Sequence, residues 1–409
     1  MTAKDNPMIL RPDLVLLPLD DDAVVFSEAA QRLVGLNATA AFIFAALQAG
    51  QPSATVAQSL VDSGRARGHE APHWVNDTID ALATHGMLAD GLVAATPPAA
   101  PTIGAGRVAV PPFAPAAVVA ERRYRLLGTT MLIRFGHLAQ RRLVDAVIGH
   151  LAIGDGPPPE HVMDIQGEVF DLNQIRSHIY LDGAAIGHAQ RLSFLGPRVK
   201  AALWLSAVNA HDFLMFIHAG VVGTDRGCIL LPAAPGSGKS SLTMALTHRG
   251  YRYYSDEVAL IETHGFRVPP VPLAICVKNT GWDLMARYCP EIMTLPVHRR
   301  EDRKVVRYIP PPVAAAGYPR ACVNHIIFPK YVAGAENNLK PMPRAVALGR
   351  LMDQCMALRR RLDRDIAVEL VLWIAGISCH ELIFSSLDAA GELIGRELAQ
   401  SPNSIRQYR

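Results

Sequence analysis

The residues with the clearest chemistry form the run Gly236-Ser237-Gly238-Lys239-Ser240, in which two glycines precede a lysine and a serine. Because glycine has no side chain, backbone N–H groups can converge there on phosphate oxygens. The lysine can supply a mobile positive charge to a terminal phosphate, and the serine hydroxyl can ligate Mg²⁺. The pattern predicts a phosphate-binding loop for ATP with Mg²⁺. Its residues are Pro235, Gly236, Ser237, Gly238, Lys239, Ser240 and Ser241.

The segments that flank this loop have the order that a nucleotide site requires. Gly227–Leu231 is short and apolar, which predicts a buried strand, and a helical pattern runs through Leu242 and Leu246 to Gly250. The positive end of such a helix attracts phosphate. Ala233 stands at the first glycine of the usual motif, and a structural loop can carry the same residues by chance. The flanking strand and helix favour the nucleotide site.

Two adjacent acids, Asp256 and Glu257, follow this helix. They lie between the apolar runs Tyr251–Tyr254 and Val258–Ile261, which both predict strands. Carboxylates at the end of a strand beside a phosphate loop commonly hold Mg²⁺ or polarise an attacking nucleophile. We therefore expect Ser240, Asp256 and Glu257 to form the metal site. The alternative is a solvated turn.

Other polar residues are candidates for the same site. His218 lies within the apolar run Phe216–Val222, which predicts a strand, and a lone histidine there is more often structural than catalytic. The basic stretch His298–Arg307 can reach over the site and supply a cation to the γ-phosphate. Lys304 is the preferred cation and Lys278 the second. A solvated loop explains this stretch equally well.

The whole chain has the size and composition of a globular protein with two or three domains. It has 409 residues, and its net charge of +3 gives no reason to expect nucleic acid or a membrane as partner. Met1–Asp13 lacks the apolar segment of a secretory signal. Polar residues interrupt the apolar stretches Ala202–Val222 and Leu370–Phe384, which predicts buried core elements rather than membrane spans. Six scattered cysteines fit reduced thiols, so we expect a cytoplasmic protein.

A composition shift divides the chain. Residues 94–120 are rich in alanine and proline, which favours an extended linker. We interpret residues 1–93 as a small domain and residues 121–409 as a large one. In the large domain, Tyr124–Phe135 predicts a strand and Arg344–Leu362 predicts an amphipathic helix.

The small domain is expected to contain two strands and three short helices. The strands are Leu14–Leu17 and Ala23–Phe26; the helices are Ala40–Leu47, Thr55–Ser63 with Ser53 as its N-cap, and Val75–His85. This set suits a winged-helix-like α+β module. It has no Lys/Arg-rich recognition helix, which weighs against DNA binding.

Three segments of the small domain resemble the PqqD family. They are Leu36-Asn37-Ala38-Thr39-Ala40-Ala41-Phe42-Ile43-Phe44, Ala54-Thr55-Val56-Ala57 and Ile79-Asp80-Ala81-Leu82-Ala83-Thr84-His85-Gly86-Met87-Leu88. The resemblance implies a peptide-recognition element that captures the leader of a ribosomal precursor peptide as an added strand. Exposed sheet edges bind peptides in this way. A winged-helix domain for dimerisation or DNA binding is the alternative.

The stretch from His218 to Ile261 resembles the HPr kinase/phosphorylase superfamily. The matching features are His218, Gly236–Ser240, Arg249-Gly250 and Asp256-Glu257, at matching spacing. The resemblance implies a P-loop kinase domain in which Asp256 is the general base for a substrate hydroxyl, with Glu257 beside it. His218 would help to set the charge around the transferred phosphoryl group. Glu257 replaces an aspartate of the family.

Departures downstream point to one branch of that superfamily. Ala274–Asn279 stands where bacterial HPr kinases carry a Glu-x-Arg-Gly-Leu-Gly run. Val277-Lys278-Asn279 and Phe328-Pro329-Lys330-Tyr331 instead resemble HPr-kinase-related proteins encoded beside PqqD-type chaperones. Activity on HPr, phosphorolysis and reversibility are therefore open questions. The acceptor, the choice of ATP over GTP and a homo-oligomeric state are also open.

Together these features predict an α/β protein with a P-loop, HPr-kinase-like C-terminal domain after a small winged-helix-like, PqqD-like domain. The expected function is an ATP-dependent kinase that phosphorylates a Ser/Thr hydroxyl of a precursor peptide or small partner protein held by the N-terminal domain. One alternative is a nucleotide-gated peptide-binding chaperone without phosphotransfer. Another is ATP-dependent activation of a carboxylate or a small molecule. The acid pair favours chemistry, because a binding switch needs no base.

Overall fold

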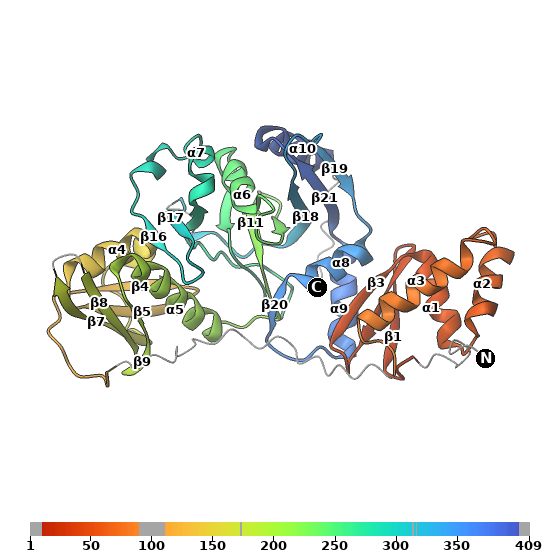
Figure 1. The fold of residues 1–409 in the computed structure, drawn as a ribbon, viewed down its shortest axis with the longest axis horizontal. Coiled ribbons are helices and arrows are strands. Elements are labelled where there is room, and N and C mark those ends of the chain that lie inside the picture. Colours follow the sequence, from red (N-terminus) through yellow and green to blue (C-terminus); the bar gives the residue numbers. More distant parts are fainter. Residues whose placement is uncertain (1–9, 90–110, 172–173, 313–314, 316, 401–409) are drawn as a thin grey trace.

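The computed structural model describes residues 10–89, 111–171, 174–312, 315 and 317–400 and has a mixed α/β fold (Figure 1). A central mixed sheet lies between a second six-stranded sheet and the N-terminal strands and helices. The expected α/β class is confirmed. Within the described ranges, no helix is long and apolar enough to cross a membrane.

The N-terminal segment forms three antiparallel strands followed by three helices. They are β1 Leu14–Leu19, β2 Asp22–Ser27, β3 Arg32–Leu36, α1 Ala38–Gln48, α2 Ser53–Asp62 and α3 Ala71–Thr84. The expectation of two strands is wrong, because β3 adds a third. Most side chains of β3 are buried, so it lacks the apolar–polar alternation that indicates a strand. Ser53 is the first residue of α2 rather than its N-cap, which is Pro52.

Both faces of this N-terminal sheet are covered. Val34 packs with residues of α1 and α3 on one face, and Leu33 packs on the other face with two helices from the C-terminal part of the chain. These helices are α8 Arg344–Asp353 and α9 Arg364–Ala375. Gly35 approaches α8 so closely that a Cβ atom there would lie 2.1 Å from the carbonyl oxygen of Ala345. Only glycine fits this contact.

The predicted linker is described only in part. Its residues 94–110 lie outside the described residues, residues 111–119 have almost no regular secondary structure, and a strand begins at Ala120, inside the predicted linker. The division into domains at residues 93 and 120 stays a prediction.

The second six-stranded sheet has the order β6-β4-β5-β7-β8-β9, and α4 and α5 pack on it. Its elements are β4 Ala120–Leu126, β5 Thr129–Phe135, α4 Leu138–Ile148, β6 Ala152–Ile153, β7 His161–Asp171, β8 Gln174–Leu181, β9 Ala184–Ala189 and α5 Leu195–Ala210. The single strand predicted for Tyr124–Phe135 is wrong, because this segment contains a hairpin. Leu127 and Gly128 turn the chain with φ angles of 51° and 89°.

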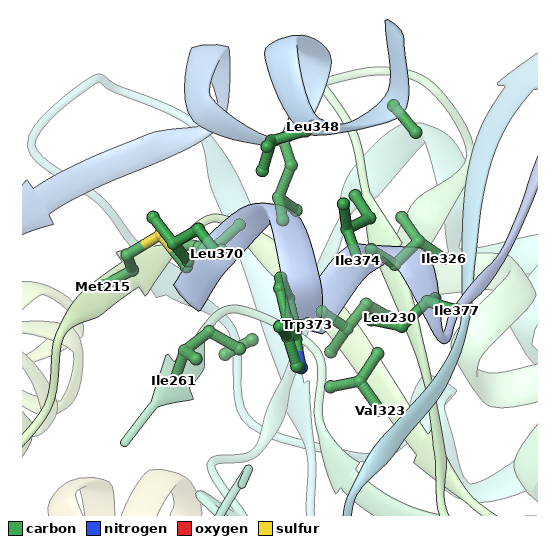
Figure 2. Packing of buried hydrophobic residues seen from close by; sticks show 14 of the residues in the cluster. Met215, Leu230, Ile261, Val323, Ile326, Leu348, Leu370, Trp373, Ile374 and Ile377 are labelled. Atoms are coloured by element: carbon green, nitrogen blue, oxygen red, sulfur yellow. The ribbon is translucent and has the colours of Figure 1, made fainter. Parts of the chain in front are cut away.

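The central sheet has the order β13-β11-β12-β18-β21-β19. Its strands are β11 Ala219–Gly223, β12 Cys228–Pro232, β13 Arg252–Ser255, β18 Val323–Tyr331, β19 Asn338–Pro341 and β21 Ser378–Phe384. Helices α6 Lys239–His248 and α10 Leu387–Gln400 cover one face, and α8 and α9 cover the other. Figure 2 shows Leu370 and Trp373 of α9 packed among Leu348 of α8 and sheet residues such as Leu230.

Two small sheets complete the fold, in the orders β14-β10-β20 and β15-β17-β16. Their strands, with one short helix, are β10 Met215–Ile217, β14 Ala259–Ile261, β20 Cys355–Leu358, β15 Ile275–Lys278, α7 Trp282–Met285, β16 His298–Arg299 and β17 Val305–Ile309. The strand predicted for Phe216–Val222 is split at His218, because β10 and β11 join different sheets. The helix predicted to reach Leu362 ends at Asp353, because the chain beyond it pairs with β10 as β20.

Two buried histidines predict a loss of stability at acidic pH. Burial lowers the pKa of His298 and His325 to about 4, from an ordinary value of 6.5. Because the folded pKa is the lower one, the unfolded chain takes up these protons first, and stability is lost as the pH falls from 6.5 towards 4. At about pH 5 each histidine would cost up to about 2 kcal/mol.

Urea unfolding at about pH 7 and about pH 5 measures this effect, and the urea midpoint is expected to be lower at the acidic pH. The His325→Leu variant should lose less stability between the two pH values than the wild type. An equal loss in both proteins would contradict the assignment to His325.

Candidate active site

The topology of the central sheet brings the predicted residues to one edge. Strand β11 is antiparallel to both β12 and β13, so β12 and β13 run in the same direction and end where β11 begins. The glycine loop follows β12, Asp256 follows β13, and His218 precedes β11. Strands β18 and β21 are parallel to β12 and end at this edge too. Ligands of open α/β sheets usually bind at such carboxyl ends.

The glycine loop adopts a backbone conformation that favours glycine at two positions. Gly236 and Gly238 have φ angles of 94° and 83°. A Cβ atom on Gly238 would lie 2.8 Å from the ring of Phe384 and 3.1 Å from the Cβ atom of Tyr331, whereas one on Gly236 would meet no atom within 4 Å. The backbone N–H of Tyr331 donates to the carbonyl oxygen of Ser237 at 3.0 Å. The ends of β18 and β21 therefore support the loop, while Gly236 faces open space.

Lys239 joins the loop to the acid pair. It is the first residue of α6, is 7% exposed, and its Nζ atom donates a hydrogen bond of 2.8 Å to the backbone carbonyl of Asp256. Burial lowers the pKa of Lys239, against the attraction of the Asp256 and Glu257 carboxylates. A cation at the start of a helix, where backbone N–H groups lack helical partners, is suited to bind phosphate.

Asp256 is a buried acid with one oxygen left without a partner. Its side chain is bonded to the side chain of Ser240, but its Oδ1 atom has no hydrogen-bond partner in the described structure. Burial raises the pKa of Asp256 to about 6, although Lys239 and Ser240 favour the charged form. A carboxylate with a pKa near neutrality beside a phosphate loop is suited to accept a proton from a hydroxyl.

Glu257 is adjacent to Asp256 but has a different environment. Its carboxylate forms an ion pair with Lys200 of α5, which is 4% exposed. Burial acts to raise the pKa of Glu257, but the charges of Lys200, Arg300 and Lys239 outweigh it and lower the pKa. The two acids therefore differ: Asp256 is close to taking up a proton at neutral pH, and Glu257 stays charged.

His218 lies at the same edge, between β10 and β11. Its Nδ1 atom is 3.1 Å from the backbone carbonyl oxygen of Glu257. Burial lowers the pKa of His218, and the charge of Lys239 lowers it further. The ring is therefore neutral at neutral pH and close to the loop. Its effect on a transferred phosphoryl group stays a prediction.

The basic stretch contributes a different residue from the predicted one. The ammonium of Lys304 lies 2.7 Å from the Asp302 carboxylate in the exposed turn between β16 and β17. Arg300, in the same stretch, lies 3.9 Å from the sulfur of Cys276 and helps to lower the pKa of Glu257. The catalytic role of Lys304 stays a prediction, and Arg300 is the residue of this stretch whose charge acts on the acid pair.

Sequence reasoning also missed Lys200. The signal that could have found it is a single charged residue in the otherwise apolar or small run Val199–Val208. Lysine is almost never fully buried unless it is paired, so such a residue predicts a buried acidic partner. The partner, Glu257, is 57 residues away in sequence, and only the fold brings the two together.

The oxygen atoms at this edge fit a small, hard cation. The Ser240 hydroxyl and the Asp256 carboxylate lie together, and hydroxyl and carboxylate oxygens are the ligands that Mg²⁺ prefers. Among the described residues, no three His, Cys, Asp or Glu side chains gather into a metal-binding group. Mg²⁺ is commonly held by one or two carboxylates together with substrate phosphates. The residues therefore fit Mg²⁺ that binds with a nucleotide.

Comparisons with known proteins find only weak similarities. No family model and no curated protein matches the sequence. The solved structure of "TbiB1 in Complex with the TbiA(beta) Leader Peptide" is 19% identical, with 20% of this chain and 96% of that chain covered and a TM-score of 0.19. The HPr(Ser) kinase/phosphatase from Coxiella burnetii is 13% identical, with 45% and 97% covered and a TM-score of 0.21. TM-scores this low do not establish a shared fold.

Proposed function

We propose that this protein is an ATP-dependent phosphotransferase that acts on a hydroxyl group of a peptide or small protein. The observation that carries the proposal is the arrangement at the edge of the central sheet. Lys239 begins the helix after the glycine loop and donates a hydrogen bond to the backbone carbonyl of Asp256. The Asp256 carboxyl is hydrogen-bonded to Ser240, and its Oδ1 atom has no partner in the described structure. This combination offers a phosphate cradle, a cation and a base.

Each group of residues has a separate role in the proposed reaction. The loop amides and Lys239 bind the β- and γ-phosphates and stabilise the charge of the transition state. The acceptor oxygen bonds to the γ-phosphorus, the bond from that phosphorus to the β–γ bridging oxygen breaks, and ADP leaves with the electron pair. Asp256 takes the hydroxyl proton on Oδ1. Mg²⁺, when bound by Ser240 and Asp256, would neutralise phosphate charge.

The acceptor peptide is proposed to bind at the N-terminal sheet. Strand β3 is at the edge of that sheet, and a cleft of about 490 Å³ runs beside it. Arg32, Val34 and His85 line the cleft on the N-terminal side, and Val346 and Arg350 of α8 line it on the other. An extended peptide can add to such an edge by backbone hydrogen bonds. A peptide in this cleft would contact both parts of the chain.

A nucleotide-gated chaperone is the second candidate, and the position of Arg350 favours it. Arg350 lines the peptide cleft, while its guanidinium bonds to Glu381 of β21 at 3.0 Å and lies over the ring of Phe328 in β18. The C-terminal ends of these two strands contact the glycine loop through Phe384 and Tyr331. A change at the loop therefore has a short physical route to the cleft.

Mass spectrometry of the precursor peptide encoded nearest this gene tests the two candidates. The peptide is incubated with the protein and Mg·ATP, and with the Asp256→Asn variant in parallel. A gain of one phosphate group that depends on Asp256 would support the kinase and locate the acceptor. If peptide and nucleotide bind tightly and each strengthens the binding of the other, without a mass change, the chaperone is favoured. Without binding or a mass change, the peptide is not the substrate.

A further inference from the structure

Lys200 is a buried cation that the proposed reaction does not use. It lies on α5 between Val199 and Leu203, two residues with no exposure that pack in the core against the second sheet. Lys200 is itself 4% exposed. A buried ammonium is costly unless a partner compensates its charge, so its retention in an apolar helix calls for an explanation.

The partners of Lys200 lie at the active-site edge. Its Nζ atom forms an ion pair with the carboxylate of Glu257 and lies 5.3 Å from the centre of the Tyr308 ring. The backbone of Glu257 is held as well, because its carbonyl oxygen contacts Nδ1 of His218 at 3.1 Å and its N–H donates to Ser255 at 3.3 Å. Glu257 is therefore fixed at both its backbone and its side chain.

The two adjacent acids are held by different helices. Asp256 is hydrogen-bonded to Ser240 and is close to Lys239, and both of these residues lie in α6. Glu257 instead forms its ion pair with Lys200 of α5. We propose that Lys200 is a positioning residue, which holds the Glu257 carboxylate on α5 and leaves Asp256 as the one acid of the pair that serves Mg²⁺ and the acceptor. This inference rests on the proposed function and limits the metal ligands to Ser240 and Asp256.

Electrostatic repulsion explains why only one acid of the pair should face the nucleotide. Two adjacent carboxylates facing a triphosphate would repel it, and a free glutamate would compete with the phosphates for Mg²⁺. With Lys200 in place, the cations near the acid pair are Lys200, Lys239 and Arg300, against two acids. Without Lys200, the Glu257 carboxylate would lose its partner on α5 and would be free to turn towards the phosphate loop and Mg²⁺. The expected result is weak binding of Mg·ATP rather than loss of the base.

Variants of the full chain test this proposal. Lys200→Met keeps the length of the side chain and removes its charge, Lys200→Arg keeps the charge, and Glu257→Gln removes the partner charge. Isothermal titration with Mg·ATP gives the affinity of each variant without any acceptor. We expect Lys200→Met to weaken Mg·ATP binding about tenfold or more. In the transfer assay its KM should rise more than its kcat falls. Lys200→Arg should bind nearly as the wild type does, and the exposed Lys340→Met is the matched control.

The double variant Lys200→Met/Glu257→Gln separates positioning from direct phosphate contact. If Lys200 acts through Glu257, removing both charges should restore most of the lost affinity and of the lost melting temperature. Equal affinity of Lys200→Met and wild type, or no restoration in the double variant, would overturn the proposal.

A wild type that binds no Mg·ATP would overturn the proposed function. The melting temperatures of the variants are measured without nucleotide, so they test the Lys200–Glu257 ion pair even if the protein does not bind Mg·ATP. Restoration of the melting temperature in the double variant supports the Lys200–Glu257 pair. Strictly additive losses overturn it.

Discussion

The Lys239→Ala variant is expected to bind Mg·ATP poorly and to transfer phosphate on the order of 100- to 1,000-fold more slowly than the wild type. Lys239 is the cation at the start of α6, and its ammonium is held beside the acid pair by the carbonyl of Asp256. No other residue of the loop Pro235–Ser241 carries a positive charge. Removal of the side chain leaves only backbone dipoles to stabilise the charge that develops on the phosphates.

The fold should survive this substitution. Burial lowers the pKa of Lys239, so the ammonium pays a desolvation cost that alanine avoids, which offsets the lost hydrogen bond of about 1 kcal/mol. Initial rates and calorimetric titration measure the effect, and thermal melting checks the fold. Lys340→Ala, an exposed lysine on β19, is the control. Normal turnover by Lys239→Ala would remove the loop from the mechanism.

The glycine loop and its flanks were predictable because their signals are local. A short apolar strand, two glycines at the turn and a helix that ends before Gly250 follow one another along the chain, and the structure has them in that order. The position of the acid pair was also predictable from the sequence, since β13 and Asp256 follow α6 after a short turn. In each case the residues that define the feature are close together in sequence.

The residues that were missed depend on contacts between distant segments. Lys200 and Glu257 meet because α5, which packs on the second sheet, also shares its core with Val258 and Leu260 next to the acid pair. The burial pattern of β3 does not alternate along the chain because α8 covers its second face. The helix predicted through Leu362 ended early for a similar reason. Its second half pairs with β10, more than 130 residues away in sequence, and this pairing outweighs local helical periodicity.

The Asp256→Asn variant should separate nucleotide binding from chemistry. Asparagine keeps the size of the side chain but cannot accept the hydroxyl proton, so we expect phosphotransfer to fall by about 100- to 10,000-fold. Mg-free nucleotide binding should change little, because Lys239 bonds to the backbone carbonyl of Asp256 rather than to its side chain. In the wild type, transfer should fall at acidic pH, since only the charged Asp256 carboxylate is a base.

The same substitution should stabilise the protein at neutral pH, which a purely structural acid would not do. The folded pKa of Asp256, about 6, lies above its ordinary value of 3.8. The folded state therefore takes up this proton first, and the stability that the residue contributes at low pH is lost as the pH rises through about 6. At neutral pH the buried charge costs up to about 3 kcal/mol. Without Mg²⁺, Asp256→Asn should melt at a higher temperature than the wild type at about pH 7.5 but not at about pH 4. A lower melting temperature at both pH values would mean that the carboxylate is compensated in the fold, and Asp256 would then be a poor base.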